Sequence, residues 1–155
     1  EPVALVAGFA EALSHLPEFD ALNQAVPPGA SPRIRHQRDQ LLQSLQSLRG
    51  VQLSGPGGGQ RLPNHVSLLL TTPNGRPLSG RAVVRELSRL GVAVSSGSAC
   101  SAGLKTDSPV LSAMNLAPEL RQSGLRITLG PWITDQQLDG VSGKLAKAMA
   151  TVAAD

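Results

Sequence analysis

The strongest candidate for chemistry in this 155-residue chain is its single cysteine, Cys100. A cysteine reacts as its thiolate, and the reference pKa of the thiol is about 8.5. A lone cysteine is more often a buried structural residue. Here the neighbours within four positions are Ser, Gly and Ala, with Leu104 as the single bulky apolar exception. From the residues alone, a reactive thiol and an inert one are about equally favoured.

Arg126 is the second candidate, because it lies in the middle of a predicted strand between Leu125 and Ile127. A partly buried charge without a partner is costly, so the guanidinium must find an anion. Its planar shape suits the two oxygens of a carboxylate, which predicts a substrate-binding role. A structural ion pair with an Asp or Glu side chain is an equally good interpretation of the sequence.

Other familiar kinds of site are not indicated. The histidines His15, His36 and His65 lie far from Cys100 in sequence and lack metal-ligand spacing, so each is interpreted as structural or surface. One cysteine excludes an internal disulfide and a cysteine-cluster metal site. A net charge of only +3 and 2% aromatic residues argue against a nucleic-acid partner. Neither a membrane span nor a signal peptide is recognised, and a lone thiol fits a cytoplasmic location.

The elements that must position Cys100 and Arg126 alternate between helices and strands. Apolar spacing and end signals predict helices at residues 3–14, 32–50, 79–90, 109–114 and after Thr134, and strands at 51–53, 66–70, 92–94 and 125–129. Helix 3–14 is apolar on nearly all sides, which predicts packing on more than one face. Nine consecutive small residues at 95–103 predict a mobile loop. The pattern predicts an α/β or α+β sandwich, with a small mixed or antiparallel sheet covered by helices.

Two further segments allow a phosphate-binding interpretation that we do not favour. The basic residues Arg33, Arg35, His36 and Arg38 gather in the first turns of one predicted helix. A solvated face is the simpler interpretation, although positive charge there opposes the helix dipole. Residues 55–59 are glycine-rich, but a strand follows them rather than a helix, which favours a flexible turn.

The loop around Cys100 resembles the active-site loop of cysteine desulfurases, which are class-V-aminotransferase-like pyridoxal-phosphate enzymes. It reads Ser95, Ser96, Gly97, Ser98, Ala99, Cys100, Ser101, Ala102, Gly103. The order of the flanking segments is also similar to that family: residues 34–41 with Arg38 and Asp39, residues 62–64, 91–94, 110–114, and 125–130 followed by Thr134. The resemblance covers essentially the whole chain.

This resemblance implies the small C-terminal domain of a fold-type-I enzyme at residues 31–155, with residues 1–30 as the linking helix and connector from a large domain. It implies that Cys100 is the nucleophile, which takes sulfur from cofactor-bound L-cysteine as a persulfide and leaves L-alanine. Arg126 would bind the substrate carboxylate. Ser95, Ser96, Gly97, Ser98, Ala99 and Ser101 would form the active-site loop. The implied partners are a sulfur-acceptor protein in iron–sulfur or thiolation pathways and a second copy in a homodimer.

Two departures from the family pattern remain. Residues 71–80 are longer than usual and predict a surface hairpin of unknown role. The cofactor residues of the family's large domain have no counterpart, and Lys105, Lys144 and Lys147 lie in unsuitable contexts. We therefore expect a fragment that is inactive alone and binds neither pyridoxal phosphate nor metal. The alternatives are a selenocysteine lyase or another carbon–sulfur lyase of the same family, and a non-enzymatic persulfide carrier or scaffold.

Overall fold

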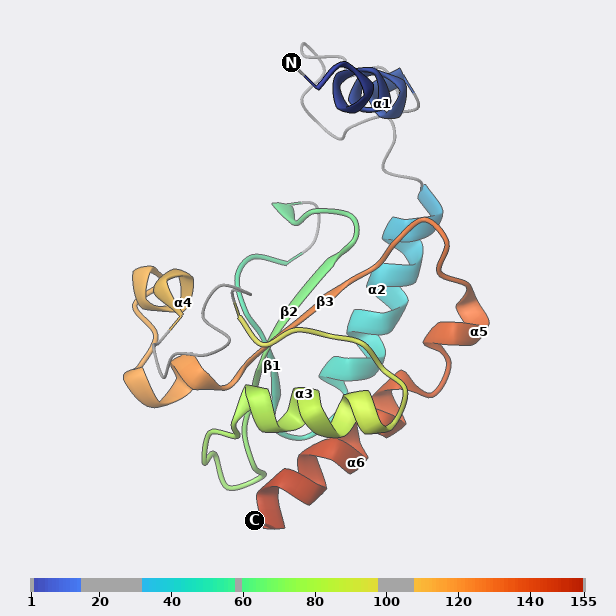
Figure 1. The fold of residues 1–155 in the computed structure, drawn as a ribbon. Coiled ribbons are helices and arrows are strands. Elements are labelled where there is room, and N and C mark those ends of the chain that lie inside the picture. The colour runs from blue at the N-terminus through green and yellow to red at the C-terminus, as the bar shows by residue number, and fades with distance from the viewer. Residues whose placement is uncertain (1, 15–31, 58–59, 98–107, 155) are drawn as a thin grey trace.

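The computed structural model describes residues 2–14, 32–57, 60–97 and 108–154 (Figure 1). Their elements in chain order are α1 (Val3–Ser14), α2 (Pro32–Gln46), β1 (Val51–Leu53), β2 (His65–Leu70), α3 (Gly80–Arg89), α4 (Pro109–Ala113), the 3-10 helix η3 (Pro118–Gln122), β3 (Gly124–Thr128), α5 (Asp135–Leu138) and α6 (Val141–Ala154). None of the helices in these ranges is long and apolar enough to cross a membrane.

The centre of the fold is a three-stranded antiparallel sheet in the order β1-β2-β3. In the register, Val51 pairs with Leu70 and Leu68 pairs with Leu125. Paired residues share a face, and successive residues of a strand alternate between faces. One face is therefore aliphatic, and its members are Val51, Leu53, Val66, Leu68, Leu70, Leu125 and Ile127.

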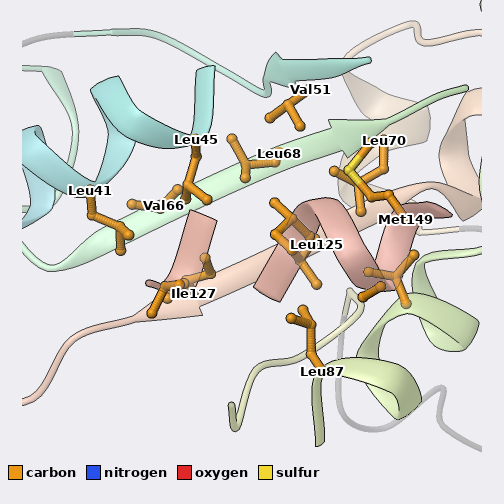
Figure 2. Packing of buried hydrophobic residues seen from close by; sticks show 14 of the residues in the cluster. Leu41, Leu45, Val51, Val66, Leu68, Leu70, Leu87, Leu125, Ile127 and Met149 are labelled. Carbon is orange, nitrogen blue, oxygen red and sulfur yellow. The ribbon is translucent and has the colours of Figure 1, made fainter. Parts of the chain in front are cut away.

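Helices α2, α3 and α6 cover this aliphatic face. Figure 2 shows side chains of all three helices meeting those of β2 and β3, among them Leu45, Leu87 and Met149. Leu45 is fully buried, and Leu68 and Val66 beneath it are fully buried too. The helices are amphipathic, so burying their apolar sides against the sheet supplies the main driving force for folding.

Among the described residues, helices α2, α3 and α6 leave the opposite face of the sheet free, and we call it the open face. It carries His65, Ser67 and Arg126, which are half-buried. At one end of this face α4 lies close by, because a Cβ atom at Gly124 would lie 3.2 Å from a methyl carbon of Leu111. Leu69, the register partner of Gly124, is buried there. The helices thus leave Arg126 on the accessible side of the sheet.

Most of the predicted elements are confirmed, and with them the fold class. The Ser79 hydroxyl caps α3 by accepting a bond from the Ala82 amide, and Ser108 caps α4 in the same way. Thr134 and Gln137 form a capping box at the start of α5. Residues 71–77 form a hairpin with a bridge between Thr71 and Pro77.

Two expectations are corrected by the structure. Residues 92–94 are not a strand; the sheet-like pairing begins only at Ser95 and is a single bridge. The last helix is two helices, because Gly140 between α5 and α6 has a φ of +76°, outside the helical region. No residue of α1 is buried, so the predicted packing partner of this helix does not lie among the described residues. Its exposed apolar side chains are Val3, Leu5, Val6, Phe9 and Leu13.

Candidate functional site

The backbones of Ser95 and Arg126 pair directly at the edge of the sheet. The Ser95 amide donates to the Arg126 carbonyl at 3.0 Å, and the Arg126 amide donates to the Ser95 carbonyl at 2.6 Å. Arg126 also pairs with Ser67 of β2 on its other side. The first residue of the predicted active-site loop is therefore fixed to the predicted carboxylate-binding residue.

The described part of the loop ends two residues later, at Gly97. Ser96 and Gly97 are half-buried, and Gly97 has a φ of +71°, a conformation that side-chain-bearing residues rarely adopt. The remaining predicted loop residues, Ser98, Ala99, Cys100 and Ser101, lie outside the described residues. The structure therefore brings Ser95 to Arg126, with Ser96 and Gly97 following along the chain, and leaves the position of the thiol as a prediction.

The guanidinium of Arg126 has no hydrogen-bond or ion-pair partner within the described ranges. Ion pairs within these ranges join Arg38 to Asp39 and Arg89 to Glu86. The alternative interpretation of Arg126 as half of a structural ion pair thus finds no carboxylate in this part of the chain. A half-buried guanidinium without a partner favours the other interpretation, in which it binds an anion that comes from outside.

Three cationic side chains, Arg126 among them, lie around His65. Arg61 is held by the carbonyl oxygens of Pro56, at 3.0 Å, and of Ser54, and its Nη1 lies 3.3 Å from Nδ1 of His65. Arg38 donates to the carbonyl oxygen of Leu62 at 2.9 Å. We call Arg38, Arg61, His65 and Arg126 the cationic cluster.

The charges of this cluster act on its one histidine. Burial lowers the pKa of His65 below 6.5, and the positive charges of Arg61, Arg126 and Arg38 lower it further. Burial and the charge of Arg38 also lower the pKa of Arg61. His65 is therefore neutral at pH 7, and the cluster keeps an excess of positive charge that suits an anionic ligand.

Arg38 corrects the prediction of a solvated basic face on this helix. Its side chain is only 2% exposed, because residue 38 shares a face of α2 with Leu41 and Leu45 at i+3 and i+7. Arg33 is exposed, yet it donates to the carbonyl oxygens of Pro131 and Ile133 and ties α2 to the segment before α5. Arg33 and Arg38 thus hold neighbouring segments in place.

Sequence reasoning missed Arg61 and did not connect His65 with Arg126. The sequence interprets His65 as structural or surface, because it lies far from Cys100 and lacks metal-ligand spacing. The signal that connects them is the strand register, which places His65 opposite Thr128 and so on the same face as Arg126. That register becomes visible only once the sheet is assembled.

The described residues fit a carboxylate but do not fit pyridoxal phosphate. Their lysines, Lys144 and Lys147, both belong to α6, which packs on the aliphatic face of the sheet, away from Arg126. These ranges also contain no group of three or more His, Cys, Asp or Glu side chains that could hold a metal ion.

A comparison with protein families decides the affiliation of the chain. The model of the aminotransferase class-V family matches residues 1–141. The chain belongs to this family. Its likeness to cysteine desulfurases, first indicated by the loop around Cys100, is supported by individual relatives.

Two relatives illustrate this similarity. The cysteine desulfurase IscS of Glaesserella parasuis is 29% identical over 119 residues, which cover 76% of this chain and 28% of the relative. The cysteine desulfurase IscS of Acinetobacter baumannii is 35% identical over 109 residues, which cover 70% of this chain and 25% of the relative. The chain therefore spans about a quarter of the length of the curated relatives that it matches.

The fold also matches that of a solved relative. The NifS-like protein from Rickettsia africae superposes with a TM-score of 0.60 at 20% identity, over 76% of this chain and 28% of that one. The small antiparallel sheet with its helices is thus the fold found in part of NifS-like fold-type-I proteins.

Proposed function

We propose that this chain is the cysteine-bearing portion of a cysteine desulfurase, which removes sulfur from L-cysteine and leaves L-alanine. The observation that carries the proposal is the paired backbone of Ser95 and Arg126. It joins the start of the loop that contains the only cysteine to an arginine with no carboxylate partner in the described residues. The similarity to cysteine desulfurases supports the same assignment.

In this proposal Arg126 binds the α-carboxylate of the substrate through its planar guanidinium. The thiolate of Cys100 then attacks the sulfur of the substrate. A sulfur–sulfur bond forms on Cys100 as the carbon–sulfur bond of the substrate breaks. The electron pair of the broken bond stays with the three-carbon fragment, which takes up a proton and leaves as alanine. The persulfide is passed on to an acceptor protein.

In this proposal the cofactor is pyridoxal phosphate, and a large domain outside the described residues binds it. We assign residues 1–30 to the link between that domain and the small domain at 31–155, as the family resemblance implies. The exposed apolar side chains of α1, Phe9 and Leu13 among them, support this division, because a helix that is apolar on all sides needs cover. We also propose that the full-length enzyme is a homodimer in the cytoplasm.

The test is to express the chain together with the coding sequence that precedes it, and to measure alanine release from L-cysteine. Cys100→Ser should abolish both alanine release and the persulfide, detected by mass spectrometry. Arg126→Gln should lower kcat/KM for L-cysteine by about a hundredfold or more, because two charged hydrogen bonds are lost. Arg85→Gln, on the exposed side of α3, is the matched control and should leave kcat/KM unchanged.

Each outcome discriminates among the interpretations. Alanine release that survives Cys100→Ser would refute the nucleophile assignment. A strong preference for selenocysteine over cysteine would identify a selenocysteine lyase of the same family. A persulfide carried by Cys100 without any preceding lysine-bearing sequence would identify a carrier and refute the desulfurase proposal.

A further inference from the structure

We propose that His65 is a second carboxylate-binding residue, which donates a hydrogen bond from its Nε2–H to the same carboxylate that Arg126 binds. The identity of that carboxylate, an amino acid of the cysteine–alanine type, rests on the proposed function. The presence of a carboxylate subsite formed by two strands rests on the geometry of the open face alone.

The tautomer of His65 follows from its neighbour Arg61. A guanidinium can only donate hydrogen bonds, so the 3.3 Å contact requires that Nδ1 of His65 accepts. In a neutral imidazole the proton must then be on Nε2, which becomes a donor. Arg61 cannot turn away easily, because the carbonyl oxygens of Ser54 and Pro56 also hold it. The chain thus fixes which ring nitrogen of His65 presents a proton.

The strand register places this donor beside Arg126. His65 pairs with Thr128, and Arg126 lies two residues before Thr128 on the same strand and the same face. Such diagonal neighbours in an antiparallel sheet are about 7–8 Å apart. Side chains that start from neighbouring positions on one face can converge on the same carboxylate, each through a hydrogen bond of about 2.8 Å. Ser67 lies directly opposite Arg126, and His65 lies two residues before Ser67 on β2.

The positive charges around His65 favour the binding of an anion there. Arg61, Arg126 and Arg38 all act on the imidazole with positive charge, and Asp39, the carboxylate paired with Arg38, has a side chain that is 54% exposed. A bound carboxylate would offset this positive charge and favour protonation of the imidazole. Binding should therefore be visible directly as a change in the titration of His65.

The experiment is an NMR titration of the full 155-residue chain with L-alanine, at constant ionic strength and neutral pH, in ¹⁵N-labelled protein. L-Alaninamide, which lacks the carboxylate, is the ligand control, and the exposed His36 is the internal control. Without ligand, the ring nitrogens of His65 should show the Nε2–H tautomer. L-Alanine should shift Nε2 saturably and raise the pKa of His65, whereas L-alaninamide and His36 should show neither effect.

Three variants separate the roles of the residues. His65→Leu should weaken L-alanine binding about tenfold or more, and His65→Gln, which keeps an amide donor, should restore part of the loss. Arg61→Gln leaves His65 in place and should abolish its tautomer preference. It also provides a test if His65→Leu does not fold.

The results of these experiments test the role of His65 separately from the proposed function. Binding that is lost in Arg126→Gln but unchanged in His65→Leu would overturn the role of His65 and leave the role of Arg126 intact. A His65 ring that carries its proton on Nδ1 would overturn the inference as well. If the longer protein lacks desulfurase activity but the 155-residue chain binds L-alanine saturably, the proposed function is refuted and the carboxylate site at His65 and Arg126 is supported.

Discussion

The contact between α3 and β3 depends on the absence of a side chain at Gly80. A Cβ atom at this position would lie 2.3 Å from the carbonyl oxygen of Gly124 and 3.2 Å from that of Gln122. Both obstacles are backbone atoms at the start of the strand that carries Arg126. Since an ordinary contact is more than 3.4 Å, α3 or β3 must move by about 1 Å in Gly80→Ala, and overpacking of this kind costs about 1–3 kcal/mol.

Gly143 on α6 is the matched control, because a Cβ atom there meets nothing within 4 Å. Gly143→Ala should stabilise the protein by about 0.5–1 kcal/mol, the usual gain from alanine in a helix interior. Urea unfolding followed by circular dichroism should therefore give opposite shifts in the midpoint for the two variants, with unchanged m-values. In thermal unfolding, the loss in Gly80→Ala corresponds to a fall in Tm of about 2–12 °C. Equal stability of the two alanine variants would refute the close packing of α3 on β3.

Two further predictions concern ionisation and cofactor binding. Because the folded-state pKa of His65 lies below 6.5, the unfolded state binds more protons there, so stability falls as pH drops from 7 through 6.5 toward that pKa; His65→Gln should remove this part of the slope in urea midpoints measured against pH. Pyridoxal phosphate and borohydride should leave no stoichiometric adduct on the 155-residue chain, as judged by intact mass, and a stoichiometric adduct would contradict our placement of the cofactor lysine in another domain.

The sequence carried enough information to predict the elements whose ends are coded locally. Ser108 and Thr134 identify helix starts because a hydroxyl before the first turn satisfies a free amide. The strand around Arg126 was recognisable because its aliphatic residues alternate with polar ones. These signals depend on neighbouring residues only, so no knowledge of the assembled fold was needed.

The incorrect predictions concern features that depend on contacts between segments far apart in the sequence. Residues 92–94 have the composition of a strand, but the bridge to β3 begins only at Ser95, since pairing is set by the partner strand. Arginine side chains are usually solvated, which is why the sequence predicts a solvated Arg38. In the fold, Arg38 lies on the buried side of α2 and donates a hydrogen bond to the carbonyl oxygen of Leu62. The link between His65 and Arg126 likewise depends on long-range register, which no local pattern encodes.

The cationic cluster also implies that a bound anion stabilises the fold. Arg61, Arg126 and Arg38 repel a proton on His65, and within the described residues Asp39 is the single carboxylate paired with any of them. A ligand that binds only the folded chain stabilises it by mass action, by about 1.4 kcal/mol at ten times its Kd. For a domain of this size that is a rise in Tm of about 3–6 °C. L-Alanine should produce it in calorimetry at constant ionic strength, and L-alaninamide should not. An equal rise in Arg126→Gln would mean that the anion binds elsewhere, because the carboxylate would then not need the guanidinium on the open face.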